Sequence, residues 1–158
     1  MFMIKKNKFD RKGLFSDKSF DKDHVVMSLR GNKLTREDIK GIDKNIIDGF
    51  LQIGKDLFLD MGNEHEKYIN HNCNPNCYIK AIVNSAFLIA LRPIAKDEEL
   101  TFDYSLTSTD IAEEWNINCV CHRFYCRGLI TGFDSLDDKK KDEAIKNSII
   151  PRYISSRT

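Results

Sequence analysis

Three cysteines within eight residues limit most strictly what this chain can fold into. They follow the pattern Cys119-x-Cys121-x4-Cys126. Zinc takes four tetrahedral ligands, and closely spaced thiolates supply them readily. The alternative, three buried free thiols, is disfavoured because such tight clustering seldom arises without a metal. The spacing therefore predicts a metal site in the last third of the chain.

The fourth metal ligand has to come from another part of the chain or from His122. His122 lies between two of the cysteines, where its backbone would aim the ring away from them. A better source is the stretch YINHNCNPNC, residues 68–77, which carries Cys73 and Cys77. The residues alone leave the choice between these two open. Either one would tie this polar stretch to the C-terminal part of the chain.

Composition indicates a single intracellular domain. The 158 residues suffice for one core, and a formal charge of +1 gives no electrostatic case for binding nucleic acid or an anionic membrane. The five cysteines form an odd count, and no signal peptide is evident, which argues against a secreted disulfide framework. The longest uncharged run, 81–91, is too short to cross a bilayer. The cytoplasm, the nucleus and delivery into a host cell remain open as locations.

Short apolar runs separated by turn residues predict a mainly β fold. We expect two strands in FLQIGKDLFLD, two more around Asn84-Ser85, and a further strand in LTFDY that carries Tyr104. Ser135 and the acidic residues after it predict a helix that Pro151 ends. Its apolar residues are sparse, which favours a helix lying on the surface.

Several polar residues are candidates for chemistry, each with an ordinary structural explanation. Asn70 and His71 either present hydrogen-bonding groups to a ligand or cap a turn. Tyr104 either orients a reacting group or packs like most strand tyrosines. Gly13 either admits a ligand near the backbone or makes a plain turn. Glu98 and Glu99 are expected to face solvent.

Taken in order, these segments resemble the SET-domain protein-lysine methyltransferases with their post-SET zinc module. The chain has RKGLF, then KYINHNCNPNC, then DEELTFDY, then CVCHRFYCRG. The family pattern has a GxG loop, RFINHSCxPNC, GEELTFDY and CxCx4CRG at comparable spacing. The last three elements together are highly specific, and the resemblance runs from about residue 8 to residue 132.

The resemblance implies a fold and a ligand set. It implies a SET domain over residues 1–112, a post-SET zinc module over 113–132 and a C-terminal helical tail over 133–158. The implied fold has several small sheets, with the chain threaded through a pseudoknot. The implied zinc ligands are Cys73, Cys119, Cys121 and Cys126, which leaves Cys77 out.

The resemblance also implies methyl transfer from S-adenosylmethionine to a lysine amine of a protein. Tyr104 matches the catalytic tyrosine, and Phe102 matches a tyrosine/phenylalanine position where phenylalanine favours adding more than one methyl group. The positions that match the family's cofactor contacts are Lys12, Gly13, Leu14, Asn70, His71 and Val120. A histone tail is the family's common substrate, and other proteins are alternatives.

The chain departs from the family pattern at several positions. Arg11 replaces the first glycine of GxG, Asn72 replaces a serine, and Asp97 replaces a turn glycine. Leu29 stands where many members carry a second active-site tyrosine, and Asp48-Gly49 precedes Phe50 where many carry aromatic cofactor contacts. Arg11 and Leu29 support the alternative of a non-catalytic SET module that binds a protein partner or a lysine-containing tail. Cofactor binding would separate the two.

Two segments outside these motifs complete the expectations. Asp110, Glu113 and Glu114 are expected to border the substrate groove, where they would attract a basic peptide, or else to form a solvated acidic loop. The tail is expected to have modest order and no catalytic role. The alternative is that Ile149, Ile150 and Tyr153 fold back beside the cofactor or lysine channel.

Overall fold

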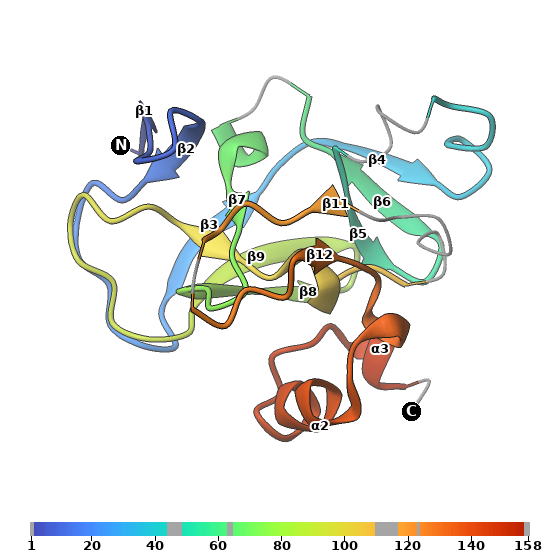
Figure 1. Ribbon diagram of the computed structural model, residues 1–158. Coiled ribbons are helices and arrows are strands. Elements are labelled where there is room, and N and C mark those ends of the chain that lie inside the picture. Colours follow the sequence, from blue (N-terminus) through green and yellow to red (C-terminus); the bar gives the residue numbers. More distant parts are fainter. Residues whose placement is uncertain (1, 44–48, 63–64, 110–116, 123, 157–158) are drawn as a thin grey trace.

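Short strands paired into small sheets make up most of the computed structural model (Figure 1), as the sequence predicts. The structure describes residues 2–43, 49–62, 65–109, 117–122 and 124–156. Within these ranges no helix is long and apolar enough to cross a membrane. The predicted Asp110, Glu113, Glu114 and Asp48 lie outside the described residues.

The N-terminal half consists of hairpins and two three-stranded sheets. β1 (Met3–Lys6) pairs with β2 (Lys12–Phe15), and β3 (Val25–Leu29) joins β9 (Ser85–Ala90) and β8 (Cys77–Ile82) in the order β3-β9-β8. The other sheet has β6 (Leu57–Asp60) between β4 (Asn32–Thr35) and β5 (Phe50–Gly54). Both expected hairpins are therefore present. The second turns at Val83-Asn84, one residue earlier than predicted, because Ile82 pairs with Ser85.

The segments that carry the polar motifs are short. The 3-10 turn η1 (His65–Tyr68) precedes β7 (Asn70–His71), which pairs in parallel with β10 (Thr101–Phe102). The 3-10 turn η2 (Tyr104–Leu106) follows directly. The prediction that the strand extends through Tyr104 is therefore wrong, because the strand ends at Phe102 and Tyr104 begins a 3-10 turn. The Asp103 carboxylate accepts from the Ser105 N–H and caps the 3-10 turn in which Tyr104 lies.

β11 (Ile117–Asn118) pairs with β12 (Leu129–Ile130) and frames the cysteine-rich loop. The chain then forms the 3-10 turn η4 (Phe133–Ser135) and the helices α2 (Asp138–Lys146) and α3 (Arg152–Ser155). Asp137, rather than Ser135, caps α2 by accepting from the Lys140 N–H. α2 ends at Lys146, earlier than the predicted helix. Pro151 is the N-cap of α3 and does not end α2.

The tail packs against the domain and does not merely lie on the surface. In Figure 1, α2 and α3 gather at one end of the molecule, with β1 and β2 at the other. The main core joins residues of the sheets, including Leu14, Leu29 and Phe102. A second buried cluster joins Leu106 to residues of the tail, namely Phe133, Leu136, Ala144, Ile149 and Ile154. Ile149 and Tyr153 therefore fold back onto the domain: Ile149 is buried in this second cluster, and the Tyr153 hydroxyl donates to the Thr107 carbonyl.

Candidate active site and metal centre

The parallel pairing of β7 with β10 brings the two polar motifs together. Asn70 pairs with Thr101, and His71 pairs with Phe102, across about thirty residues of sequence. The Asn72 N–H continues the ladder by donating to the Phe102 carbonyl at 3.1 Å. This pairing places His71, at the end of β7, in contact with Tyr104, two residues beyond the end of β10.

Tyr104 is held at both its backbone and its ring. Its N–H donates to His71 Nδ1 at 3.2 Å, and its hydroxyl donates to the Ile69 carbonyl at 2.7 Å. The Phe102 ring lies 4.7 Å from the Tyr104 ring, centroid to centroid. Burial raises the pKa of Tyr104 to about 12, so the hydroxyl keeps its proton near neutral pH. The geometry suits a hydrogen-bonding group that orients a ligand, rather than a base.

His71 links this tyrosine to the cysteines. The Tyr104 N–H can only donate, so Nδ1 of His71 is the acceptor and the proton of the neutral ring sits on Nε2. Nε2 lies 3.3 Å from Cys73 Sγ. Burial lowers the pKa of His71 to about 4, so the ring is neutral at physiological pH. Its role in this arrangement is positional.

A narrow cavity of about 160 Å³ opens beside Tyr104. Its other apolar walls come from Phe50, Leu51, Ile69 and Phe102. Thr107 also lines it, and the Thr107 hydroxyl donates to the Tyr104 carbonyl at 3.0 Å. A channel of this kind accepts an unbranched apolar chain and removes water from a polar group at its end.

The predicted cofactor residues Lys12, Gly13 and Asn70 form one cluster. The Asn70 amide donates to the Lys12 carbonyl at 2.9 Å and to Glu99 Oε1 at 2.8 Å. A Cβ at Gly13 would lie 2.3 Å from Glu99 Oε1. Gly13 therefore permits a close approach, and the expectation that Glu99 faces solvent is wrong. The Glu98 carboxylate is also bonded within the protein, because it accepts hydrogen bonds from the side chains of Asn76 and Arg92.

The remaining predicted cofactor residues differ in their exposure. The Leu14 side chain is fully buried, and its carbonyl accepts from the Leu100 N–H at 2.7 Å. The structure therefore gives Leu14 a core position. Val120, between two of the cysteines, is 37% exposed and available for contact.

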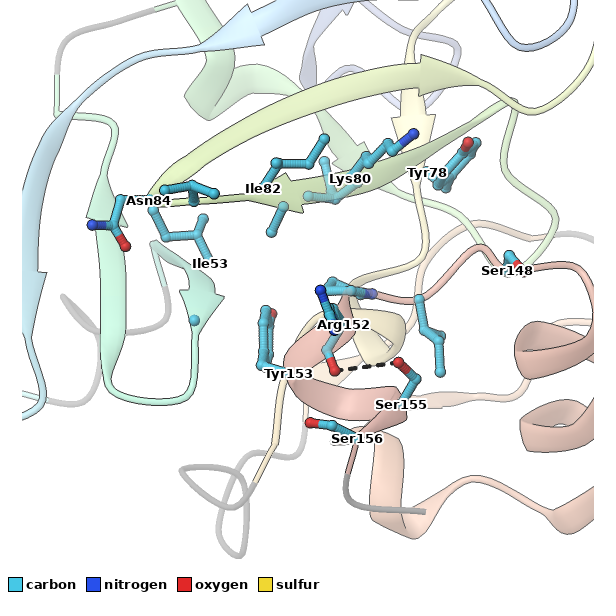
Figure 2. Close-up of a pocket in the computed structure, with 16 residues that line it drawn as sticks. Ile53, Tyr78, Lys80, Ile82, Asn84, Ser148, Arg152, Tyr153, Ser155 and Ser156 are labelled. Atoms are coloured by element: carbon cyan, nitrogen blue, oxygen red, sulfur yellow. Dashed lines mark hydrogen bonds between the residues drawn. The ribbon is translucent and has the colours of Figure 1, made fainter.

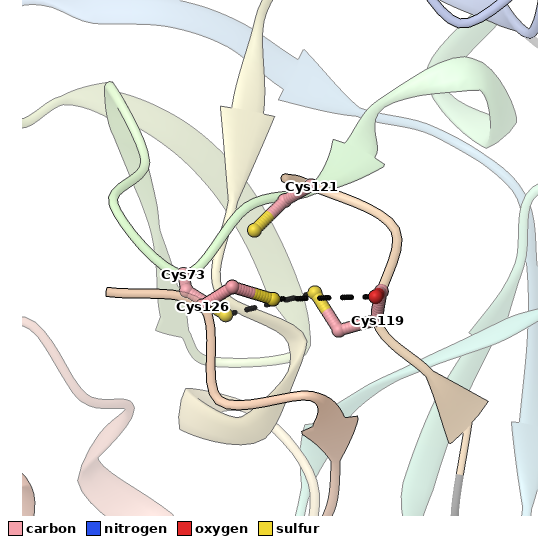
Figure 3. A group of neighbouring side chains, drawn as sticks. All are labelled: Cys73, Cys119, Cys121 and Cys126. Carbon is pink, nitrogen blue, oxygen red and sulfur yellow. Dashed lines mark hydrogen bonds between the residues drawn. The ribbon is translucent and has the colours of Figure 1, made fainter. Parts of the chain in front are cut away.

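The four predicted zinc ligands converge (Figure 3). The Sγ atoms of Cys73, Cys119, Cys121 and Cys126 all lie within 4.8 Å of one another. Cys73 Sγ and Cys119 Sγ are 3.6 Å apart. Four thiolates at Zn–S distances of about 2.3 Å form a tetrahedron of this size, so the donor set fits zinc. Cys77 is fully buried in the main core, away from this cluster, and burial raises the pKa of its thiol to about 12.

An ion pair that we did not predict lies between the tyrosine and the cysteines. Both terminal nitrogens of Arg127 donate to the buried Asp103 carboxylate at 2.7 Å. The backbone N–H of Arg127 donates to Cys73 Sγ at 3.5 Å. The two residues are visible in the sequence, as the arginine directly after Cys126 and the aspartate directly before Tyr104. Their pairing depends on the fold and is invisible in either segment alone.

The structure shows where four of the residues that depart from the family pattern lie. Asp97 adopts a left-handed backbone with φ 64°, which aspartate tolerates better than most residues, and pairs with Lys5 at 2.6 Å. Asn72 forms a local turn by accepting from the Asn74 N–H. Leu29 is buried in the main core and does not line the cavity beside Tyr104. Arg11 is exposed.

Comparison with known families agrees with this arrangement. The SET domain family model matches residues 11–105, which is more than half of the chain. The chain therefore belongs to the SET domain family. The match begins just before β2 and ends within η2, so it includes the cluster around Asn70 and the residue Tyr104.

The chain is similar to curated histone-lysine methyltransferases. It is 37% identical over 68 residues to histone-lysine N-methyltransferase SETD1 of Drosophila melanogaster, covering 40% of this chain and 4% of that protein. It is 29% identical over 147 residues to SETD1A of Homo sapiens, covering 82% and 8% respectively. It is 29% identical over 130 residues to the H3 lysine-4 specific enzyme of Schizosaccharomyces pombe, covering 75% and 14%. The chain thus spans only a small fraction of each relative.

Proposed function

We propose that this chain is a protein-lysine N-methyltransferase that uses S-adenosylmethionine. The observation that carries the proposal is the position of the Tyr104 hydroxyl at a narrow apolar cavity, next to the strand that bears Asn70 and His71. S-adenosylmethionine would supply a methyl group bound to its sulfonium. The neutral lysine nitrogen would take this methyl group as the carbon–sulfur bond breaks, the cofactor would leave as the neutral thioether, and the excess amine proton would pass to solvent.

The cavity at Tyr104 is the proposed lysine channel. Phe50, Leu51 and Phe102 would pack along the aliphatic stem, and the amine would reach the Tyr104 hydroxyl. An apolar channel lowers the pKa of the entering amine and so favours the neutral form that can attack. Methyl transfer needs an in-line approach, so fixing the amine supplies much of the acceleration. The bond of the Tyr104 hydroxyl to the Ile69 carbonyl fixes the ring for that purpose.

Asn70 and its partners form the proposed cofactor side. The Asn70 amide is fixed by Lys12 and Glu99, which leaves its carbonyl oxygen to accept from a ligand. Gly13 keeps the β2 backbone close to this group. Val120 offers an apolar contact from the cysteine-rich loop. His71 acts indirectly, by holding the Tyr104 backbone.

The proposed zinc would be held by Cys73, Cys119, Cys121 and Cys126 and would have a structural role. Four cysteines leave no open coordination position, which is typical of structural zinc. The Nε2–H of His71 and the backbone N–H of Arg127 both point to Cys73 Sγ, so both would stabilise its thiolate. Residues 113–132 are thus proposed as the post-SET module that closes the cofactor side.

Phe102 leads us to propose more than one round of methylation. A tyrosine at this position would place a hydroxyl near the amine, whereas phenylalanine leaves that space to a methylated nitrogen. Phe102 lines the cavity and packs against Tyr104, so its ring is where such a difference would act.

The proposed substrate is a lysine in an extended protein segment, with histone tails as the leading candidates. The curated relatives named above are histone-lysine methyltransferases, and some are specific to H3 lysine 4 by name. The segment expected to attract a basic peptide lies outside the described residues, so the choice of target rests on the relatives.

Transfer of labelled methyl from S-adenosylmethionine to core histones and to cell lysate tests the proposal. Wild type is compared with Tyr104→Phe, which keeps the ring and removes only the hydroxyl. Label on a protein band that disappears in the variant supports the enzyme and identifies the substrate. Absence of label on every band, from folded and zinc-loaded protein, would favour the non-catalytic binding module.

A further inference from the structure

A groove of about 650 Å³ runs between β8 and the C-terminal tail, away from the site described above. Figure 2 shows Lys80 and Ile82 on the strand along one side, with Arg152 and Tyr153 of α3 opposite. None of its lining residues lines the cavity at Tyr104. Its walls are largely apolar, with Ile82, Val83 and Ile150 as the main contributors.

The charge of the groove has one sign. Lys80 and Arg152 line it, and no Asp or Glu is among the sixteen described residues that line it. Neither cation forms an ion pair with a carboxylate among the described residues. Both are exposed. In a chain whose net charge is only +1, two unpaired cations facing one groove select an acidic occupant.

The backbone of β8 offers a place for an extended segment. β8 is an edge strand, because its sheet has the order β3-β9-β8. The Leu91 N–H donates to the Asn76 carbonyl, so the bonded pairs of this ladder fall on even-numbered residues of β8. The N–H and C=O of Ala81 therefore point away from β9, and no hydrogen bond within the described part of the chain uses them. The backbone N–H and C=O of Ile79 point the same way, but Ile79 is only 2% exposed. Ala81 is therefore the accessible position on this edge.

The hairpin tip beside the groove is strained in a way that favours a binding role. Val83 and Asn84 form the two central residues of the turn, with φ of 38° and 62°. Asparagine and glycine suit such positions, whereas a β-branched residue there is an outlier. Val83 is also 90% exposed, so its side chain contributes little to the core. A strained, exposed valine that lines a groove is better explained by contact with a partner than by folding.

We propose that this groove docks an extended segment of a partner protein in which acidic and apolar side chains alternate. The segment would pair with the outer edge at Ala81, place apolar side chains on Ile82, Val83 and Ile150, and place carboxylates beside Lys80 and Arg152. Addition of a strand to a free sheet edge is a common mode of peptide recognition. The proposal does not depend on methyl transfer.

Fluorescence anisotropy with two labelled ten-residue peptides tests the docking on the full chain without cofactor. One peptide alternates Val and Glu, and the other alternates Val and Lys. The acidic peptide is expected to bind at least about tenfold more tightly, and less tightly as salt rises. Lys80→Glu combined with Arg152→Glu should weaken its binding about tenfold. The matched control reverses two exposed lysines outside the groove, Lys22→Glu with Lys33→Glu, and should leave binding unchanged.

Val83→Asn separates docking from folding. It relieves the turn, so the melting temperature should rise, while loss of the apolar contact should weaken binding of the acidic peptide severalfold. A purely structural residue would not change these two quantities in opposite directions. Equal affinity for the two peptides, no binding of either, or binding that survives the Lys80/Arg152 reversal would each overturn the proposal. Undiminished binding by Val83→Asn would overturn the assigned role of the hairpin tip.

Discussion

The hydroxyl oxygen of Tyr153 lies 2.6 Å from the carbonyl oxygen of Thr107 and 2.8 Å from that of Gln52. Thr107 lines the cavity at Tyr104, and Gln52 follows the cavity residue Leu51. The Gln52 side chain also bonds the backbone and hydroxyl of Thr109. One residue of α3 therefore ties together two segments that form walls of the proposed lysine channel.

Tyr153→Phe is expected to loosen these walls without emptying the core. The ring remains, but two largely buried carbonyls lose a hydrogen-bond donor, which should lower the free energy of unfolding by about 1–2 kcal/mol. Methyl transfer should fall severalfold, mainly through kcat, while the dissociation constant for S-adenosylmethionine stays unchanged. Urea unfolding and steady-state kinetics measure the two effects. An unchanged kcat together with lowered stability would limit Tyr153 to the fold.

Removal of residues 135–158 is expected to unfold the domain at physiological temperature. The deletion would expose Phe133 and Leu106, which are buried against Leu136, Ile149 and Ile154. Each large core side chain contributes several kcal/mol, which together exceed the stability of a typical domain. Circular dichroism of the truncated chain checks this. A folded, active truncation would show that the second cluster is dispensable.

The sequence predicted the local features of the site well because they depend on spacing. Cys119, Cys121 and Cys126 are near in sequence, so a shared ligand set follows from the pattern alone. The family resemblance was needed to choose Cys73 over Cys77, since the two differ only in where the fold carries them. The structure sends Cys73 to the cluster and buries Cys77 in the main core.

The unpredicted contacts of the site join distant segments. The Glu99–Asn70 bond joins the segments that the parallel pairing of β7 with β10 brings together, and the Asp103–Arg127 pair joins the end of β10 to the cysteine-rich loop; no local pattern reveals either. The tail was underestimated because α2 itself is mostly polar. Ala144 is the buried residue of α2, whereas most of the second cluster lies in turns and in α3.

Replacing each of the two cysteines of YINHNCNPNC in turn should distinguish the metal ligand from the cysteine that only packs in the core. Cys73→Ala removes one of four ligands and should abolish stoichiometric zinc binding, with a large loss of thermal stability. Cys77→Ala is the matched control, because its thiol lies in the apolar core. It should retain one zinc per chain at a cost of about 1 kcal/mol. Native mass spectrometry counts the metal. Equal zinc content in both variants would contradict the ligand set.

Gly13→Ala is expected to weaken S-adenosylmethionine binding through Glu99. The new Cβ would meet Glu99 Oε1 at 2.3 Å and displace it from the Asn70 amide. Loss of that orientation should raise the dissociation constant about tenfold, as measured by calorimetry. Glu99→Ala alone should have a similar effect. If the cause is Glu99, the double variant should bind no more weakly than Glu99→Ala. Fully additive losses would place the effect of Gly13 elsewhere.

Tyr104→Phe is expected to slow methyl transfer about 100-fold or more while leaving cofactor affinity within twofold, because the Tyr104 hydroxyl makes no hydrogen bond to Asn70, whose amide is held by Lys12 and Glu99. The pH dependence distinguishes an orienting phenol from a base. The pKa of Tyr104 is raised by burial to about 12, above the value near 10 of the unfolded chain, so the unfolded chain loses its proton first. The resulting stabilisation is complete below pH 10 and declines from pH 10 to 12.

Transfer by the wild type should therefore rise with pH as the substrate amine loses its proton, with no inflection from Tyr104 below pH 10. A rate that instead required ionised Tyr104, with an inflection near pH 7 that Tyr104→Phe removes, would contradict the orienting role. The rate profile should be recorded with saturating substrate and alongside melting curves, so that unfolding at high pH is separated from chemistry.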